Sequence, residues 1–204
     1  MEVIAVVRAC GERTEAECIR RVRAQVEEVR VIHVAPFHEA VRECFRIAIG
    51  SGAQWLLTVD ADVLLHPGSV KSIHTQAKKW QGWQVVGRVS DRLSGRDRMA
   101  GVRMYRVNTL PAVLPYVPDV VRPEGTLARL FAGWEPSKDV MGLHDYEQWY
   151  ADYHRKGAQH RAKHPEWTEL ARKWRRSGDP ELIAAARGWD GEPLGMAERD
   201  EYPS

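Results

Sequence analysis

Two aspartates, Asp60 and Asp62, follow the apolar run WLLTV at residues 55–59 and are separated only by Ala61. Carboxylate oxygens are ligands that suit Mg²⁺ or Mn²⁺, and these ions keep open positions for phosphate oxygens and water. Side chains alternate along an extended segment, so Asp60 and Asp62 are expected to point to the same side. The sequence therefore predicts a divalent metal site at this pair. The alternative is a solvated loop, because so short a pattern also arises by chance.

The segments before the aspartate pair alternate between apolar runs rich in β-branched residues and amphipathic stretches. The expected strands are residues 3–7, 31–34 and 55–59, and the expected helices are residues 11–29 and 39–49. Thr14 and Glu17 have the spacing of a capping box at the start of the first helix. Strand, helix, strand, helix, strand is the order of a parallel α/β sheet.

The ends of these expected strands carry the polar residues of the first half. Ligands of parallel α/β sheets bind beyond the carboxyl ends of the strands. The residues that this rule places along one rim, beside Asp60 and Asp62, are Arg8, Ala9, Pro36, Phe37 and His38.

After Pro67 and Gly68 the pattern predicts a helix over 69–80, then two β-like stretches, QVVGRV at 84–89 and GVRMYRV at 101–107. Prolines at 111, 115, 118 and 123 break the chain into loops. A further helix is expected over 143–156, because aromatic residues recur there on neighbouring faces.

The bulk composition is ordinary for a globular protein: 204 residues, 44% hydrophobic, 28% charged and a formal net charge of +2. No apolar run approaches the roughly 18 residues that a membrane span needs. The N-terminus has no basic leader, so a first strand is expected there rather than a signal peptide. Cys10, Cys18 and Cys44 are odd in number and lack metal-ligand spacing, which favours core thiols and a reduced, cytoplasmic compartment.

The segment LTVDADVLLHP, supported by GLHDYEQWY, resembles the GT-A-fold glycosyltransferases of the family-2-like, DxD-containing type. The resemblance implies a Rossmann-like α/β fold with a mostly parallel central sheet and C-terminal helices. In that family the DxD binds the metal and the diphosphate of a nucleotide sugar, and a downstream histidine is often the third ligand. His144 occupies the comparable place here; the alternative is an ordinary residue at a helix N-terminus.

The same resemblance divides the chain into a catalytic region at 1–156 and a C-terminal helical extension with a polar tail at 157–204. Within the catalytic region, residues 1–90 correspond to the nucleotide-sugar and metal half, and residues 91–156 to the acceptor half.

By the same resemblance, the donor nucleotide meets the end of the first strand, and a cationic residue on the helix before the DxD strand faces the diphosphate. The donor-binding residues implied in this way are Arg8, Ala9, Glu12, Phe37, His38 and Arg42, together with Asp60, Ala61 and Asp62. UDP is the commonest donor nucleotide of the fold. The proline–threonine opening of many members is missing from this chain, which leaves the base open. Arg42 is equally consistent with a solvated helix charge.

An inverting transferase needs a base that takes the proton of the acceptor hydroxyl. Inverting relatives often carry a Glu–Asp pair in the second half, which this chain lacks. Glu124 is the first stand-in and Asp91 the second. A retaining mechanism needs neither, so the stereochemical outcome stays open.

Two further features bear on ligands. Trp134, in the irregular segment FAGWEPSKD, is expected on a lid that orders when the donor binds. Residues 155–176 hold eight Lys or Arg and two acids, which suits an anionic acceptor such as nucleic acid or a lipid phosphate, or else a solvated helix face. A glycan acceptor is equally open.

The sequence therefore favours a metal-dependent glycosyltransferase that uses a nucleotide sugar. One alternative is a sugar-phosphate nucleotidylyltransferase, although the glycine-rich loop expected after its first strand is missing from ACGERTE. Another is a non-catalytic module that binds glycans or nucleic acid. A hydrolase with paired carboxylates is the weakest, because Asp60 and Asp62 are too close to flank a bond.

Overall fold

The computed structural model describes residues 2–194, which form two compact units. The first unit comprises the chain through Arg92 together with Arg96–Tyr146. The second comprises the turn Leu93–Gly95 and the chain from Glu147 onward. The division between the units therefore precedes residue 156, because the helix that spans this position lies entirely in the second unit.

A seven-stranded sheet in the order β2-β1-β3-β6-β5-β7-β4 forms the centre of the first unit. Its strands are β1 (Val3–Arg8), β2 (Glu28–Ile32), β3 (Trp55–Asp60), β4 (Val63–Leu65), β5 (Gln84–Asp91), β6 (Arg96–Arg106) and β7 (Trp134–His144). β1 pairs in parallel with β2 and β3, whereas β6 runs antiparallel to both β3 and β5. β7 runs parallel to β5 and antiparallel to β4. The α/β fold expected from the sequence is confirmed.

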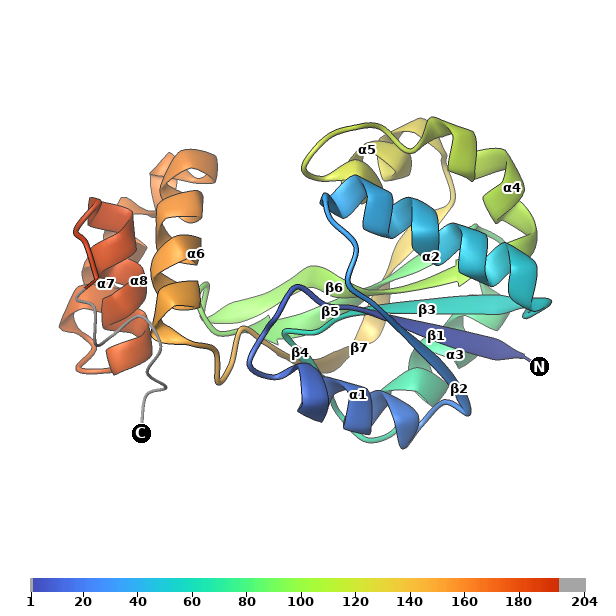
Figure 1. Cartoon of the computed structure of the whole chain (residues 1–204), viewed down its shortest axis with the longest axis horizontal. Helices are drawn as coiled ribbons and strands as arrows, with labels where there is room; N and C mark the ends of the chain where they lie inside the picture. Colours follow the sequence, from blue (N-terminus) through green and yellow to red (C-terminus); the bar gives the residue numbers. More distant parts are fainter. Residues whose placement is uncertain (1, 195–204) are drawn as a thin grey trace. The chain divides into compact units, whose positions relative to one another are not determined.

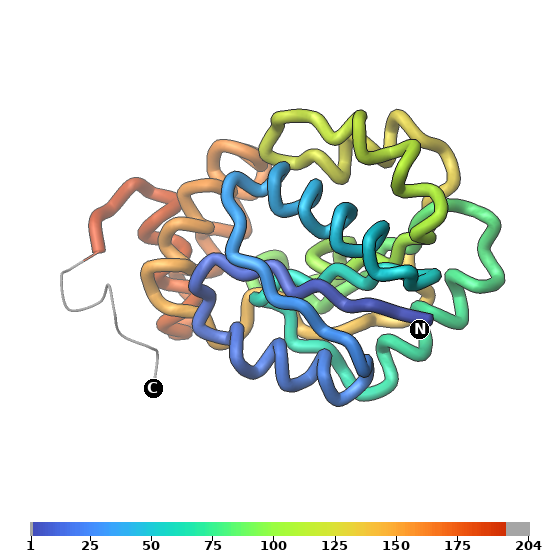
Figure 2. Tube along the Cα trace, turned by 45° about the vertical axis from the view of Figure 1, so that its right-hand side comes forward, coloured from blue at the N-terminus to red at the C-terminus, as the bar shows by residue number. Residues whose placement is uncertain are grey.

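Helices cover both faces of this sheet (Figure 1). α1 (Glu15–Arg23) and α3 (Ser69–Lys79) pack on one face, where Ala5, Val7, Leu57 and Val59 join their apolar residues. α2 (Phe37–Ser51), α4 (Leu110–Val113) and α5 (Pro123–Leu130) cover the other, with the short turns η1 (Val107–Thr109) and η2 (Leu114–Tyr116). Figure 2 shows the same layers from a second direction. A strand buried on both faces reads as a continuous apolar run, which explains the sequence at 3–7 and 55–59.

The second unit is helical and consists of α6 (Tyr150–Lys163), η3 (Pro165–Trp167), α7 (Thr168–Arg176) and α8 (Pro180–Asp190). Its core contains Tyr153, Trp174 and Trp189, and the Trp174 indole donates a hydrogen bond of 2.8 Å to the Leu93 carbonyl. α6 and α8 approach closely at Gly157 and Gly188. A Cβ at Gly157 would lie 1.9 Å from the Ala185 carbonyl oxygen, and one at Gly188 would lie 1.8 Å from the His154 carbonyl oxygen.

Several expected elements are wrong in the structure. Pro111, Pro115 and Pro123 lie in α4, η2 and α5 instead of in loops. The first helix ends at Arg23, and Glu28–Ile32 is a strand, because its β-branched residues pair with β1. The helix expected over 143–156 instead begins at Tyr150, since the chain through His144 extends β7 and pairs with β4. The expected irregular segment at Trp134 is the start of β7.

The capping box expected at Thr14 is also absent: this side chain makes no cap hydrogen bond to α1. Its hydroxyl donates instead to the Ala61 carbonyl at 2.9 Å. Among the cysteines, Cys18 and Cys44 are buried as expected, whereas Cys10 is exposed. Within residues 2–194, no helix combines the length and apolar character that a membrane crossing requires.

Candidate functional site

The carboxyl ends of β1 and β3 lie side by side, as the sequence predicts. Arg8 and Asp60 are partners in the parallel register, and the Ala61 amide donates to the Arg8 carbonyl at 2.9 Å. The start of α1 holds the same turn, because Thr14 donates to the Ala61 carbonyl and the Cys18 thiol contacts the Asp60 carbonyl at 3.6 Å. The backbone around the aspartate pair is therefore fixed from two sides.

The side chains of Asp60 and Asp62 have different partners. β3 ends at Asp60, and the chain turns at Ala61 and Asp62 before β4 begins, so the alternation of an extended strand does not apply. Asp60 accepts a hydrogen bond of 2.8 Å from Nε of Arg8. The Asp62 carboxylate instead lies 3.7 Å from Nε2 of His144.

His144 reaches this site from the end of β7. Its backbone pairs with Val63 of β4, and the next amide, that of Asp145, donates to the Asp62 carbonyl at 3.1 Å. Asp62, His144 and Asp145 each offer one ligand atom, and these atoms lie within 4.8 Å of one another. The structure thus brings together Asp62 and His144, two of the three predicted ligands. It adds Asp145, whose only signal in the sequence is its place beside His144.

A second carboxylate orients the histidine. Nδ1 of His144 lies 2.8 Å from Oδ2 of Asp91, which also pairs with Arg98. A proton on Nδ1 that points at Asp91 leaves Nε2 on the side of Asp62, and this arrangement is common for metal-binding histidines. Asp91 is 1% exposed. Burial would raise the pKa of its carboxyl, but the hydrogen bond to His144 and the charge of Arg98 lower this pKa to about 2.

Burial would lower the pKa of the His144 imidazole. The charges of Asp145 and Asp62 outweigh burial, and with hydrogen bonds to Asp145 and Asp91 they raise this pKa to about 10. The ring is therefore protonated at neutral pH in the absence of a metal, and a metal ion held by Nε2 would have to displace a proton from it.

On the other side of the rim, Arg8 belongs to a buried network of ion pairs. Its Nη1 donates to Glu124 at 2.8 Å, and its guanidinium stacks over the Phe37 ring at 4.7 Å from the centroid. Nε of Arg103 lies 3.0 Å from the same carboxylate, and the Tyr105 hydroxyl donates to it at 2.7 Å. Glu124 therefore anchors Arg8, which in turn holds Asp60.

This network sets the pKa values of its two acids in opposite directions. Burial would raise the pKa of Glu124, but Arg103 and Arg8 together lower it to about 2. For Asp60, burial and the neighbouring charges of Asp62 and Glu124 raise the pKa to about 6 against the effect of Arg8.

Glu124→Gln is expected to make the unfolding free energy less dependent on pH in acid. A carboxyl whose pKa is about 2 in the folded chain and 4.5 in the unfolded chain stabilises the fold above pH 4.5. That stability, about 3 kcal/mol, is lost as the pH falls from 4.5 to 2. Urea unfolding at a series of pH values measures it, with Glu169→Gln, at an exposed acid, as the matched control. Equal pH dependence in wild type and Glu124→Gln would contradict the network.

Gly101 of β6 lies against Asp60 and Val63, on either side of the turn at Ala61 and Asp62, and has φ of 61°. A Cβ at this position would lie 2.5 Å from Cγ2 of Val63 and 3.4 Å from Oδ2 of Asp60. Gly95, with φ of 64°, has nothing within 4 Å of an added Cβ and is the matched control. Gly101→Ala is expected to destabilise the chain by about 1–3 kcal/mol more than Gly95→Ala, because both share the backbone strain but only Gly101 adds a clash. Thermal unfolding measures the stability of both variants. Equal losses of stability would show that the turn shifts to accommodate the added Cβ.

The remaining predicted donor residues lie in separate arrangements. Arg42 pairs with Glu39 and Asp119, while Nε2 of His38 lies 3.8 Å from Asp119. His38, Glu39 and Asp119 also place one ligand atom each within 4.8 Å of one another, but Arg42 already pairs with both acids.

Near β1, Ala9 is buried at the strand end, and Glu12 accepts a hydrogen bond of 2.6 Å from the Cys10 amide, which closes the loop before α1. Trp134 lies at the opposite end of β7 from His144, so the structure does not bring it to the rim.

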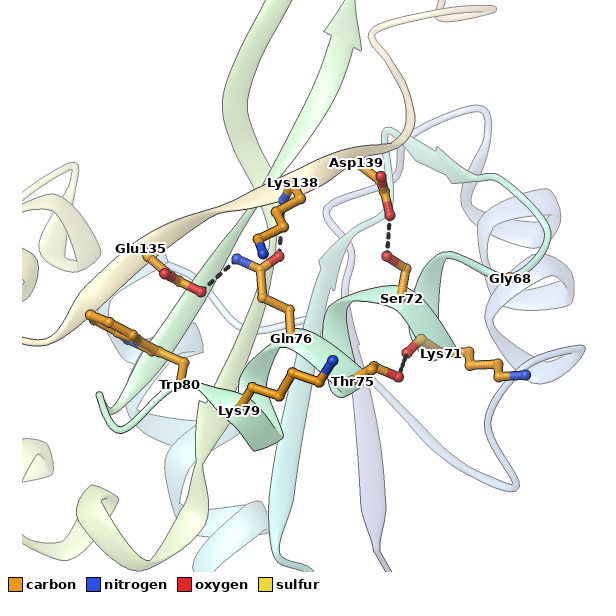
Figure 3. A pocket seen from close by; sticks show the side chains of 10 residues that line it. All are labelled: Gly68, Lys71, Ser72, Thr75, Gln76, Lys79, Trp80, Glu135, Lys138 and Asp139. Atoms are coloured by element: carbon orange, nitrogen blue, oxygen red, sulfur yellow. Dashed lines mark hydrogen bonds between the residues drawn. The ribbon is translucent and has the colours of Figure 1, made fainter.

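A hollow of about 600 Å³ lies between α3 and β7 and contains none of the predicted site residues. Figure 3 shows Gln76 near its centre, where the side-chain amide donates to Glu135 at 2.6 Å and accepts from the Lys138 amide at 2.9 Å. Ser72 likewise donates to Asp139. These contacts tie α3 to β7, and we assign the hollow no catalytic role.

At least three of the eight cations at 155–176 pair with acids of the second unit. Arg155 pairs with Asp152, and Arg172 pairs with Glu169, both at 3.0 Å. Arg175 contacts Asp190 and Glu192, and Arg161 donates to the Trp189 carbonyl at 3.0 Å. The segment therefore presents less uncompensated charge than its sequence indicates.

No protein-family model matches this sequence, and no curated protein matches it either. The solved structures that share its fold at low identity include the following two. The mannosyltransferase PcManGT from Pyrobaculum calidifontis, in complex with GDP-Man and Mn²⁺, matches 93% of this chain and 74% of its own, with a TM-score of 0.51 and 12% identity. The 4-diphosphocytidyl-2C-methyl-D-erythritol synthase from Anaerococcus prevotii matches 72% of this chain and 89% of its own, with a TM-score of 0.50 and 9% identity. The chain therefore has the GT-A-like fold that the sequence resemblance implies.

Proposed function

We propose that this chain is a glycosyltransferase that moves a sugar from a nucleoside diphosphate, UDP in the first instance, to an acceptor, with Mg²⁺ or Mn²⁺ bound at Asp62 and His144. One observation carries the proposal. Two residues far apart in the sequence meet at the carboxyl-end rim of the sheet, where ligands of such folds bind, and a buried carboxylate orients the histidine.

The donor set fits such an ion. Imidazole nitrogen and carboxylate oxygens together suit Mn²⁺, and carboxylate oxygens alone suit Mg²⁺. The contact between Asp91 and Nδ1 leaves Nε2 of His144 facing Asp62. When bound, the ion supplies positive charge to the phosphate oxygens of the leaving diphosphate. PcManGT, which shares the fold, carries GDP-Man and Mn²⁺.

In the proposed transfer, the bond between the anomeric carbon and the diphosphate oxygen breaks, and its electron pair leaves with the nucleotide. The acceptor oxygen bonds to the carbon, and its proton passes to the released diphosphate or to water. Arg8 serves the donor side: it is 5% exposed, and within residues 2–194 its Nη2 has no hydrogen-bond partner. A buried guanidinium N–H without a partner suits an anionic or carbonyl oxygen of the donor.

Glu124 and Asp91 receive positioning roles in this proposal, in place of the base roles expected from the sequence. The carboxyl pKa of each is about 2, so each is a weak proton acceptor at neutral pH. Glu124 holds Arg8, and Asp91 orients His144.

A nucleotidylyltransferase is the second candidate, favoured by the likeness to the synthase from Anaerococcus prevotii. The two activities release different products. Phosphorus NMR of the protein with Mn²⁺ and a panel of nucleotide sugars is expected to show slow release of a nucleoside diphosphate. Pyrophosphate from CTP or UTP with sugar phosphates would point to the second candidate. No turnover in either arm, combined with retained ligand binding, would favour a non-catalytic binding module.

The acceptor is a glycan, a lipid-linked phosphate or a nucleic acid. Three arginines of 155–176 pair with acids, which reduces the positive charge available to a nucleic acid. Binding of a nucleic-acid acceptor is therefore tested separately. Retention on duplex DNA that weakens steeply with salt would support it. Absence of retention at low salt would leave the glycan and lipid-linked classes.

A further inference from the structure

We infer that Asp145, and not Asp60, is the second carboxylate ligand of the divalent ion, so that Asp62, Asp145 and His144 form the protein half of the metal centre. The inference rests on the proposed function for the presence of the ion. Of the two aspartates predicted at the metal site, only Asp62 belongs to the group of close ligand atoms.

Asp60 is held on the other side of the turn. Its Oδ1 accepts from Nε of Arg8 at 2.8 Å, and Arg8 is fixed in turn by Glu124. Arg8 and Asp60 are partners in the parallel pairing of β1 with β3, so the two residues lie side by side. Asp60 is therefore absent from the group of close ligand atoms that Asp62 forms. To reach that group, its carboxylate must leave a buried guanidinium, which costs more than leaving water.

Asp145 is placed beside Asp62 by the backbone. The Asp145 amide donates to the Asp62 carbonyl at 3.1 Å, directly after the pairing of His144 with Val63. On the other side of β7, the Arg92 amide donates to the His144 carbonyl at 3.0 Å. The segment that carries Asp145 is thus fixed at both edges, and its carboxylate stays near Asp62 without a change of fold.

The backbone conformation of Asp145 is uncommon for a residue other than glycine. Its φ is 61°, in the left-handed region that few residues other than glycine, asparagine and aspartate adopt readily. The side chain is 1% exposed. Its Oδ2 lies 3.2 Å from Nδ1 of His144. One ligand atom from each of Asp62, His144 and Asp145 lies within 4.8 Å of the other two, a spacing that a single ion can bridge.

Mn²⁺ titration followed by electron paramagnetic resonance, which reports free aqueous Mn²⁺, tests the assignment. Asparagine is isosteric with aspartate and tolerates the left-handed region, so Asp145→Asn keeps the backbone and removes one charged ligand. We expect Asp145→Asn to weaken Mn²⁺ binding at least about tenfold. Asp60→Asn is expected to weaken it by no more than about threefold. Thermal unfolding of both variants checks that each is folded.

A change of ligand type separates a ligand from a residue that only positions His144. Thiolate prefers soft ions such as Cd²⁺ to Mn²⁺. Asp145→Cys is therefore expected to lose Mn²⁺ and gain Cd²⁺ affinity, with a thiolate-to-cadmium absorption band in the ultraviolet. Asp60→Cys, compared with wild type to account for the native cysteines, is expected to show no such gain.

The outcomes separate the inference from the proposed function. If wild type binds Mn²⁺ but Asp60→Asn loses it while Asp145→Asn keeps it, the inference is overturned and the metal site stands. The same holds if both variants lose it equally, or if Asp145→Cys gains no Cd²⁺ band. If wild type binds no Mn²⁺, alone or with a nucleoside diphosphate, the inference and the proposed metal dependence fall together.

Discussion

Replacing Asp62 with asparagine is expected to weaken the binding of Mn²⁺, and of a nucleoside diphosphate offered with it, by at least about 100-fold. Asp62 is the member of the aspartate pair that faces His144, at 3.7 Å, and it also belongs to the close group with Asp145. A 100-fold loss corresponds to about 2.7 kcal/mol of binding free energy. The substitution is isosteric, so the fold itself should be little affected.

Isothermal titration calorimetry of the Asp62→Asn variant against wild type measures this effect. Asp97→Asn is a suitable control, because Asp97 is an exposed aspartate in the same unit that lies outside the metal group. Wild-type affinity in Asp62→Asn would remove Asp62 from the site, whatever the behaviour of its neighbours.

Arg8→Met is expected to lower the unfolding free energy by about 3–5 kcal/mol, the cost of breaking a buried ion pair from one side. Arg8 is 5% exposed and pairs with both Asp60 and Glu124 at 2.8 Å. Its loss leaves Asp60 without that guanidinium and leaves Glu124 with Arg103. For a chain of this size, the melting temperature should fall by about 10 °C.

Thermal and urea unfolding of Arg8→Met test this expectation, with Arg172→Met as the matched control. Arg172 and Glu169 form an exposed pair, which contributes at most about 1 kcal/mol. Adding Glu124→Gln to Arg8→Met should cost less than the sum of the two single changes, since the residues share one network. Additive losses, or a loss in Arg8→Met no larger than in Arg172→Met, would contradict the network.

The rim of the site could be predicted from the sequence because its signals are local. Apolar runs end at Arg8 and at Asp60, and parallel pairing of β1 with β3 brings these ends together. The prediction that Asp62 binds a metal rests on its residue type and its place after a buried strand. His144 was expected from a resemblance, and its nearness to Asp62 is what the structure adds.

The partners of the acids could not be predicted, because each depends on chain segments that meet only in the folded state. Glu124 of α5 meets Arg8 of β1 and Arg103 of β6, and no periodicity links these three. The segment around His144 has aromatic spacing that suits a helix, yet its pairing with β4 makes it a strand. The side chains of Asp60 and Asp62 point to different partners because the chain turns at Ala61. The Thr14 hydroxyl, from a distant segment, donates to the Ala61 carbonyl and holds this turn.

The most direct test of the proposed function is a calorimetric panel of UDP, GDP, CMP and ADP with wild-type protein, each with and without Mn²⁺. We expect one nucleoside diphosphate, UDP in the first instance, to bind only when Mn²⁺ is present. Binding of no nucleotide under either condition, or equal binding with and without Mn²⁺, would contradict it.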